Sequence, residues 1–377
     1  MGPNEKESPA NVAEANPWPR RRSRRIRVGS VEVGGGAPVS VQSMTTTDTR
    51  DVETTASQIW ALAASGADIV RVAVQDAEAA DRLPEIRRAV KTPIIADIHF
   101  DYRLALRAIE RGADAVRVNP GNIGARERLR EIANAARERG VPLRIGVNGG
   151  SLSKAILARY GHPTAEAIVE SAVETAAFLD DLGFHTFKIA VKSSDVVETI
   201  RAYRLLAPRG DWPLHIGVTE AGPEAPGTVR SAVGIGVVLA DGIGDTLRVS
   251  LTADPVAEVR VGIDILKSLG LRRPGLTLVS CPSCGRCGID LIGLTSRIEK
   301  RLASELAGST ADLRVAVMGC AVNGPGEARE ADIGVAGGDG EALLFAKGRV
   351  VRKIAESEME DVVVAEVKRL ATPREER

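Results

Sequence analysis

Short apolar runs alternate with amphipathic stretches along most of the chain. Between about Val39 and Leu269, eight runs rich in β-branched residues are each followed by a segment with apolar residues at helical spacing. The runs cover residues 39–42, 69–74, 94–98, 115–118, 143–147, 186–191, 214–218 and 246–251. Eight strand-then-helix units over roughly 230 residues are typical of a TIM (β/α)8 barrel. An open, doubly wound parallel sheet is the alternative, but it does not need eight evenly spaced units.

The same pattern divides the chain into three segments. Residues 1–25 are polar and end in an arginine-rich run, which predicts a flexible, solvated arm; residues 28–36 lack the apolar stretch that a twin-arginine export signal requires. Residues 26–270 are predicted to form the barrel, with a hairpin of Ile26–Val28 and Val31–Val33 closing its bottom. A further strand-like run opens residues 276–377, which we expect to form a small α+β domain.

Composition narrows the possible functions. Lys+Arg and Asp+Glu both number 50, and aromatic residues make up 3% of the chain. A neutral chain with few aromatic residues is unlike a nucleic-acid-binding protein. No apolar run approaches the length needed to span a membrane. Four cysteines in a long chain without a signal peptide indicate metal or redox use in the cytoplasm rather than disulfides.

Polar side chains lie near the C-terminal ends of the predicted strands, where a barrel strand would otherwise point aliphatic residues inward. Several are two positions apart and therefore on one face of their strand. Active sites of TIM barrels lie at this end of the barrel. The polar residues are Arg71, Asp97, His99, Arg117, Asn119, Arg144, Asn148, Lys188, Lys192, His215, Thr219, Glu220, Arg248 and Ser250.

The basic members of this set indicate the kind of ligand. Any one of them, taken singly, is compatible with an internal ion pair, but Asp97 and Glu220 are too few to neutralise them all. A polyanion is the simplest partner, and guanidinium groups suit a diphosphate because they form several charge-assisted hydrogen bonds at once. Glycine-containing loops, such as Pro120–Gly124, add backbone N–H groups that can approach phosphate oxygens.

A cysteine cluster follows the barrel. Cys281, Cys284 and Cys287 are each three positions apart, and Cys320 stands further on, before a Gly-Pro-Gly turn that presents Glu327. Thiolates at this spacing are typical of a metal or iron–sulfur site. Zinc remains open, although zinc ribbons bring two Cys-x2-Cys pairs and the second pair is missing. A carboxylate is a harder, more exchangeable ligand for iron, so three cysteines with Glu327 would leave one labile position.

Several segments together resemble the bacterial 4-hydroxy-3-methylbut-2-enyl diphosphate synthase family. The resemblance extends from Arg24 to about Val335. The segments that carry it are Asp97–Phe100, Arg117–Asn122, Arg144–Asn148, Thr219–Gly222, Gly244–Ser250, Cys281–Cys284 and Asn323–Glu327.

The resemblance implies an oxidoreductase of the non-mevalonate isoprenoid pathway. Its reaction would be the reductive ring opening of 2-C-methyl-D-erythritol 2,4-cyclodiphosphate, with electrons from flavodoxin or ferredoxin passing through a [4Fe–4S] cluster. The implied cluster ligands are Cys281, Cys284, Cys320 and Glu327. The implied substrate-binding residues are Arg71, Arg117, Arg144, Asn148, Lys188, Arg248 and Ser250, with Asp97 and Glu220 as catalytic residues. Cys287 is absent from many members, and we expect a bystander thiol rather than a fourth ligand.

Two further expectations concern alternatives and assembly. The alternative function is a TIM-barrel lyase or aldolase acting on a phosphorylated substrate, with a structural zinc ribbon.

The last barrel helix, about residues 255–269, would carry the chain about 22 Å from the mouth to the opposite end. The cluster domain would then start too far away to cover its own barrel mouth. The element order therefore predicts a head-to-tail homodimer, as the resemblance also implies.

Overall fold

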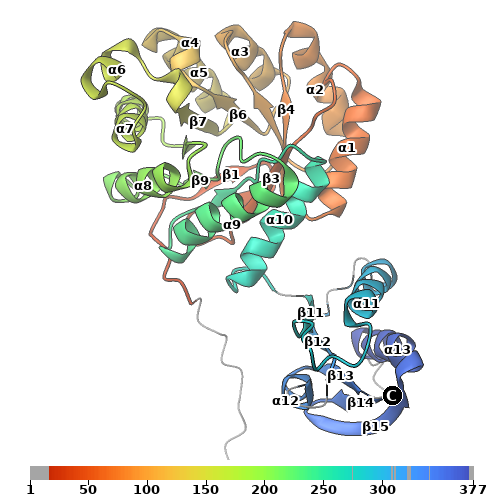
Figure 1. Cartoon of the computed structure of the whole chain (residues 1–377). Coiled ribbons are helices and arrows are strands. Elements are labelled where there is room, and N and C mark those ends of the chain that lie inside the picture. The colour runs from red at the N-terminus through yellow and green to blue at the C-terminus, as the bar shows by residue number, and fades with distance from the viewer. Residues whose placement is uncertain are drawn as a thin grey trace, which may run out of the picture. The chain divides into compact units, whose positions relative to one another are not determined.

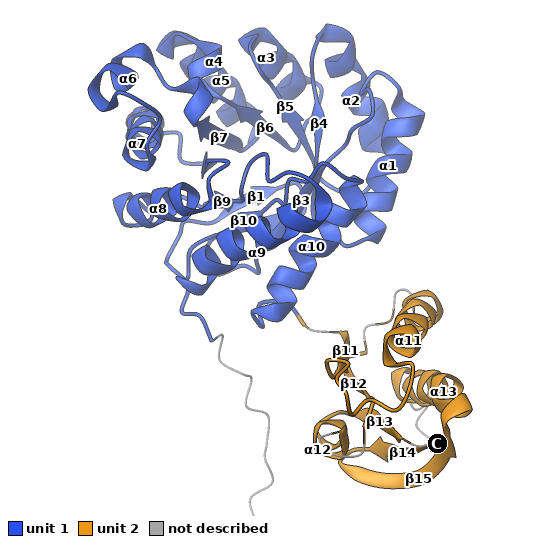
Figure 2. Cartoon of the chain, viewed as in Figure 1, with its two compact units in different colours: residues 1–272 blue, residues 273–377 orange. Residues whose placement is uncertain are grey.

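In the computed structural model, the described residues are 17–273, 275–306, 309, 311–320, 324–338 and 340–372. The chain divides into two compact units, residues 1–272 and 273–377, each with its own hydrophobic core (Figure 2).

Unit 1 is a TIM barrel, which confirms the predicted fold class. Its eight parallel strands follow the order β8-β7-β6-β5-β4-β3-β10-β9, and a bridge between Ile189 and Leu214 connects the two ends. The strands are β3 (Ser40–Met44), β4 (Ile69–Ala73), β5 (Ile94–Asp97), β6 (Ala115–Val118), β7 (Leu143–Asn148), β8 (Phe187–Lys192), β9 (His215–Ile216) and β10 (Thr246–Leu247).

Helices surround these strands (Figure 1). The main helices are α1 (Val52–Ala64), α2 (Ala77–Ala89), α3 (Tyr102–Glu110), α5 (Arg126–Arg139), α7 (Ala165–Asp181), α8 (Val196–Leu206), α9 (Glu224–Ala240) and α10 (Pro255–Ser268). Short helices α4 (Pro120–Ile123) and α6 (Lys154–Tyr160) interrupt the connections after β6 and β7. Alternate strand residues such as Val70 and Val72 are fully buried in the core shared with the helices, since both faces of a parallel barrel strand are covered.

The last two barrel strands are shorter than the sequence predicts. Gly217 has a φ of 155°, and a Cβ atom there would collide with the carbonyl oxygen of Arg248. This close approach requires glycine and bends the chain away from regular pairing after Ile216. The polar residues after β9 and β10, such as Thr219, Arg248 and Ser250, therefore lie on loops.

The N-terminal hairpin closes the bottom of the barrel, as predicted. Strands β1 (Ile26–Val28) and β2 (Val31–Val33) pair antiparallel. Their buried side chains Ile26, Val28 and Val33 pack against residues near the start of three barrel strands, Ile69, Ile95 and Ala115. An apolar plug at this end leaves the polar strand positions at the other end.

The segment before the hairpin corrects one prediction. Residues 18–25 do not form a solvated arm, because several of their side chains are bound to the barrel. Arg20 pairs with the buried Asp245 at 2.9 Å, and Arg24 pairs with Asp180 at 2.8 Å and Asp211 at 2.6 Å. The arginine-rich run therefore belongs to the barrel wall, and the rest of the predicted arm, residues 1–16, lies outside the described residues.

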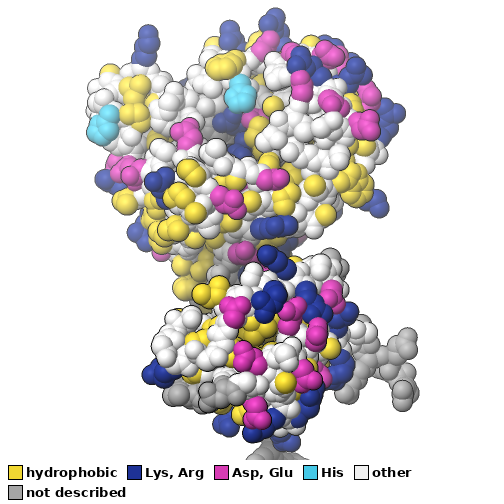
Figure 3. All heavy atoms as spheres, turned by 45° about the vertical axis from the view of Figure 1, so that its right-hand side comes forward, with side chains coloured by type: hydrophobic (Ala, Val, Ile, Leu, Met, Phe, Trp, Pro, Cys, Tyr) yellow, Lys and Arg dark blue, Asp and Glu magenta, His cyan; other side chains and the backbone are white. Residues whose placement is uncertain are grey.

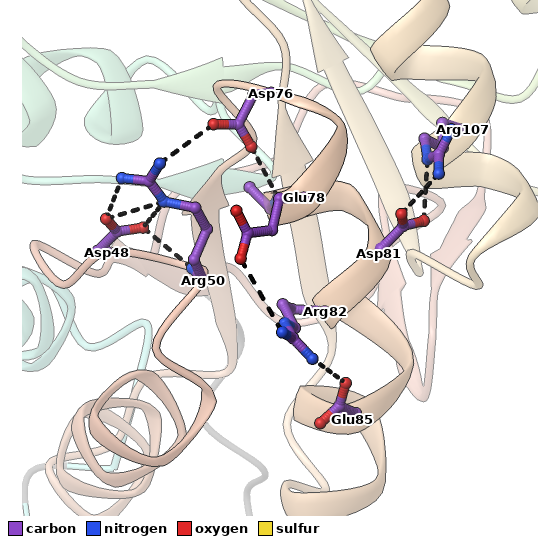
Figure 4. Close-up of polar contacts among 9 residues, drawn as sticks. Asp48, Arg50, Asp76, Glu78, Asp81, Arg82, Glu85 and Arg107 are labelled. Atoms are coloured by element: carbon purple, nitrogen blue, oxygen red, sulfur yellow. Dashed lines mark hydrogen bonds and ion pairs between the residues drawn. The ribbon is translucent and has the colours of Figure 1, made fainter.

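Ion pairs connect the loops and helices around the barrel mouth (Figure 4). Arg50, in the loop after β3, lies 2.5 Å from Asp48 and 3.4 Å from Asp76, whose carboxylate caps the start of α2. The hydrogen bond to Arg50 lowers the pKa of Asp48 to about 2. Arg107 of α3 binds Asp81 of α2 at 2.5 Å. These contacts link neighbouring strand–helix units on the surface.

Unit 2 is a mixed five-stranded sheet with helices on both faces, which confirms the predicted α+β domain. The strand order is β11 (Leu276–Ser280), β12 (Leu313–Met318), β13 (Ile333–Gly338), β14 (Glu341–Ala346) and β15 (Arg349–Ala355). Strands β11, β12 and β13 pair in parallel, and β14 pairs antiparallel with both β13 and β15. Helices α11 (Leu291–Glu305) and α13 (Met359–Ala371) cover one core, and α12 (Gly324–Arg329) contributes Ala328 to the other.

The surface agrees with the balanced composition. Basic and acidic side chains are interspersed on the face shown in Figure 3. Among the described residues, no helix is both long and apolar enough to cross a bilayer.

Candidate functional site

A cavity of about 160 Å³ opens at the C-terminal ends of the barrel strands. The barrel residues that the resemblance implies for substrate binding and catalysis all line it, apart from Lys188 and Glu220. Of the wider polar set at the strand ends, Asn119 and His215 do not line it either. The lining residues are Arg71, Asp97, His99, Arg117, Arg144, Gly146, Val147, Asn148, Ala190, Lys192, Thr219, Arg248 and Ser250.

Strand register places the charged residues side by side. Asp97 of β5 is level with Arg117 of β6, and Arg117 is level with Arg144 of β7. Gly146 provides the space they need, because a Cβ atom there would lie 3.0 Å from Nε of Arg117. A larger residue on this inward face would force the Arg117 guanidinium to shift.

Asp97 is the one carboxylate among the lining residues. Its Oδ1 accepts a hydrogen bond from Nη1 of Arg117 at 3.1 Å, and its Oδ2 lies 3.7 Å from Nε of Arg71. Burial raises the pKa of Asp97, but Arg71 and Arg117 outweigh burial and leave that pKa below its ordinary value. Asp97 is therefore an ionised group that orients two arginines.

The cavity has an excess of buried positive charge. Its lining includes Arg71, Arg117, Arg144, Lys192 and Arg248 against the single carboxylate of Asp97. Burial lowers the pKa of Arg71 to about 10. Burial, together with neighbouring arginines, also lowers the pKa of Arg144 and of Lys192 well below their ordinary values. Nε and Nη1 of Arg144 have no hydrogen-bond partner among the described residues. Such a set of donors favours a bound anion.

Lys188 lies in the barrel interior and does not line the cavity. It is 1% exposed, its Nζ has no hydrogen-bond partner among the described residues, and it is level with Arg144 in the β7–β8 ladder. Lys192, four residues on and on the same face of β8, lines the cavity instead. Lys192 is therefore the lysine of this strand that faces the cavity, and a substrate-binding role for Lys188 stays a prediction.

Glu220 also lies outside the cavity lining. It is exposed in the loop after β9 and follows Thr219, which does line the cavity. Its φ of 53° is unusual for a residue with a side chain, and Gly222 after it has a φ of 99°. Strained backbone of this kind often occurs at functional loops, and here it sets the direction of the loop at the mouth.

The glycine-containing loop after β6 has a structural explanation. Pro120–Ile123 forms one helical turn, in which the side chain of Asn119 accepts the Gly121 N–H at 3.1 Å. A Cβ atom at Gly121 would collide with the carbonyl oxygen of Ser151. Close backbone packing therefore requires this glycine, and its N–H group is already bound.

Unit 2 brings the cysteine segments together at one edge of its sheet. Cys281 directly follows β11, Cys320 comes two residues after β12, and these strands pair in parallel. Gly319 lies between two thiols: its N–H is donated to Sγ of Cys281 at 3.4 Å, and a Cβ atom there would collide with Sγ of Cys287. Cys287 donates to the carbonyl oxygen of Ile289 at 3.3 Å.

The donor set fits an iron–sulfur cluster in chemistry. All four cysteines lie in the described part of the chain and none forms a disulfide; Cys284 and Glu327 are exposed, and the others are half-buried. Asn323, in the predicted turn before Glu327, lies outside the described residues. Among those described, no three His, Cys, Asp or Glu side chains are placed to hold a metal ion. The fold thus brings the thiols to one edge without closing them around a centre.

Comparison with known proteins gives matches over both units. Residues 23–263 match the GcpE TIM-barrel domain, and residues 277–369 match the GcpE protein C-terminal domain. A protein of Geobacter sulfurreducens named 4-hydroxy-3-methylbut-2-en-1-yl diphosphate synthase (flavodoxin) is 61% identical over 93% of this chain and 98% of its own length. Proteins of the same name from Clostridium perfringens and Thermodesulfovibrio yellowstonii are 52% and 50% identical, over 92% and 93% of this chain and 98% and 99% of their own lengths.

The burial of Lys188 leads to a prediction about stability. Burial, with repulsion from Arg144, lowers the pKa of Lys188 to about 7. Below that pH the folded protein must hold a buried ammonium group. As pH rises from about 7 to about 10, the folded state loses this proton before the unfolded state does, so the penalty fades. Lys188→Met should therefore raise the melting temperature more at pH 6 than at pH 9.5, as measured by thermal unfolding. Equal gains at both pH values would contradict this, and Lys91→Met at an exposed lysine is the control.

Proposed function

The chain belongs to the 4-hydroxy-3-methylbut-2-en-1-yl diphosphate synthase (flavodoxin) family, and we propose that the barrel cavity is the site of this family's reaction. That reaction is the reductive ring opening of 2-C-methyl-D-erythritol 2,4-cyclodiphosphate to 4-hydroxy-3-methylbut-2-enyl diphosphate, a step of isoprenoid biosynthesis. The alternative, a barrel lyase with a structural zinc ribbon, has no support from the comparisons.

The excess of buried cations at the barrel mouth is the observation that supports this cavity as the reaction site. A cyclic diphosphate would neutralise the positive charge that Asp97 alone leaves unbalanced. The cationic lining residues are Arg71, Arg117, Arg144, Lys192 and Arg248. Asn148 and Ser250 add neutral hydrogen-bonding groups in the same cavity. Ring opening releases a phosphate oxygen as a leaving group, and fixed guanidinium groups stabilise the charge that develops on it.

The two carboxylates have different roles in this proposal. Asp97 is ionised between arginines, so it holds them in place and accepts hydrogen bonds from substrate hydroxyl groups. Glu220 is on the loop beside the mouth, where an exposed carboxyl group can exchange protons with solvent. We assign the acid–base step to Glu220, brought in by movement of its loop.

The C-terminal unit would hold a [4Fe–4S] cluster through Cys281, Cys284, Cys320 and Glu327. When bound, such a cluster supplies the two electrons of the reduction one at a time. Flavodoxin, which the relatives' names specify, is the proposed donor, and ferredoxin is the second candidate. Cys287 is hydrogen-bonded to a backbone carbonyl and is left out of the ligand set. Cysteines that form no disulfide and serve as metal ligands suit the reducing cytoplasm, where we place the reaction.

A head-to-tail homodimer would complete the site. Helix α10 starts beside the mouth and ends at Ser268, and Arg272 then pairs at 3.1 Å with Asp68, which precedes β4. The chain thus leaves unit 1 at the end opposite the cavity. Electron transfer needs the cluster close to the substrate, and a second chain can supply it. Two such contacts related by a two-fold axis close the assembly at two chains.

The first prediction concerns the metal. Protein prepared without oxygen should contain about four iron and four sulfide per chain, measured by metal and sulfide assays with the visible spectrum. Cys287→Ser should retain the cluster, because its thiol is already bound to Ile289, whereas Cys320→Ser should lose it. Stoichiometric zinc in a colourless protein, or bleaching by Cys287→Ser, would contradict the assignment.

The second prediction concerns the anion site. Arg117→Ala and Arg144→Ala should each weaken binding of the cyclodiphosphate by about 2 kcal/mol or more, because a buried charge-assisted contact is lost. Isothermal calorimetry measures the dissociation constant, and the cluster spectrum should stay the same. Arg103→Ala is a matched control, since Arg103 is exposed on α3 and outside the cavity lining. An unchanged dissociation constant in both variants would refute the site.

The third prediction concerns assembly. A chain with Arg144→Ala and a chain with Cys320→Ser should each be inactive alone. Co-expressed, they should regain activity, because one of the two shared sites in a mixed dimer carries neither change. Differently tagged chains allow purification of the mixed dimer. A fully active monomer in sedimentation, or no recovery in purified mixed dimers, would overturn the shared-site arrangement.

A further inference from the structure

A buried carboxylate reaches the cavity region from the outer layer of helices. Glu258 lies in the first turn of α10 and is 5% exposed. It does not line the cavity, and the sequence pattern of polar strand ends does not include it. An acidic residue at a helix N-terminus has a structural explanation in the helix dipole, but that role needs no burial.

Both oxygens of Glu258 are directed at the β10 strand end. Oε1 accepts the N–H of Leu251 at 2.8 Å, and Oε2 accepts from Nη2 of Arg248 at 3.4 Å. Leu251 directly follows Ser250, so the two contacts hold the backbone beside one cavity-lining residue and the guanidinium of another. One side chain thus fixes two groups at the mouth.

Arg248 needs such a partner because cations surround it. Its charge lowers the pKa of both Arg71 and Lys192, which shows that the three groups repel one another. Nε of Arg248 is buried without a hydrogen-bond partner among the described residues. Within that part of the chain, Glu258 is the carboxylate that forms an ion pair with Arg248. Without Glu258, repulsion would favour rotation of the guanidinium toward solvent, since the side chain is already 20% exposed.

We infer that Glu258 is a positioning residue for the anion site, which holds Arg248 and the Ser250–Leu251 backbone in the geometry that binds the diphosphate. The inference rests on the proposed function. It makes a prediction about sign: a carboxylate that only added negative charge near the mouth would weaken anion binding, and its removal would strengthen binding. A positioning residue has the opposite effect.

Glu258→Gln tests this, because glutamine keeps the shape and an acceptor for the Leu251 N–H but loses the charge that holds Arg248. We expect the dissociation constant of the cyclodiphosphate, measured by calorimetry on the full chain, to rise about tenfold. Asp254→Asn is the matched control: Asp254 caps the same helix through the Val256 N–H and is exposed, so its loss removes a nearby charge without touching Arg248. The control should leave the dissociation constant unchanged.

A double-mutant cycle with Arg248→Ala separates positioning from a general structural role. If Glu258 acts through Arg248, Glu258→Gln should add less than about twofold to the dissociation constant once Arg248 is alanine. Tighter binding by Glu258→Gln, or the same tenfold loss in both backgrounds, would overturn the inference. An Arg248→Ala chain that binds normally would instead refute the proposed site, so the two failures are distinguishable.

Discussion

The structure depends on holding an excess of positive charge at the barrel mouth. Five cationic side chains line a cavity that contains one carboxylate, and most of them are buried. Neighbouring residues accommodate this charge. Gly146 leaves space for the Arg117 guanidinium, Asp97 pairs with two of the arginines, and Glu258 of α10 pairs with Arg248. A diphosphate, the ligand that we propose, would neutralise the remaining positive charge, and repulsion among these cations would favour its binding.

The rest of the barrel makes that repulsion tolerable. The apolar hairpin fills the bottom, and Asp245 binds Arg20, Ser23 and the Leu214 N–H below the last strands. These contacts fix the strands from the end opposite the cavity. This packing restrains the strands that carry the arginines, which would keep the guanidinium groups preorganised for the proposed anion.

The second unit also uses parallel strand pairing to bring functional side chains together, in this case cysteines. Its cysteines come from two segments separated by a helix, and parallel pairing of β11 with β12 brings the segments together. Gly319 allows two thiols to approach its backbone. The cysteine thiols lie here at strand ends, as the arginines do in the barrel, so each unit presents its chemistry where its parallel strands end.

The sequence by itself determined the barrel, the small mixed domain, the face of each strand that carries charge and the cysteine segments, because strand periodicity and local spacing record these directly. Only the tertiary structure decided how deeply each side chain is buried and which residues it contacts. A period of two places Lys188 and Lys192 on one face but cannot say which reaches the cavity. Likewise, the exposure of Glu220, the binding of the Arg20–Arg24 segment to distant aspartates and the contact of Glu258 with Arg248 depend on chain segments that meet only after folding. Local pattern fixes a side chain's direction, and long-range packing fixes what it meets.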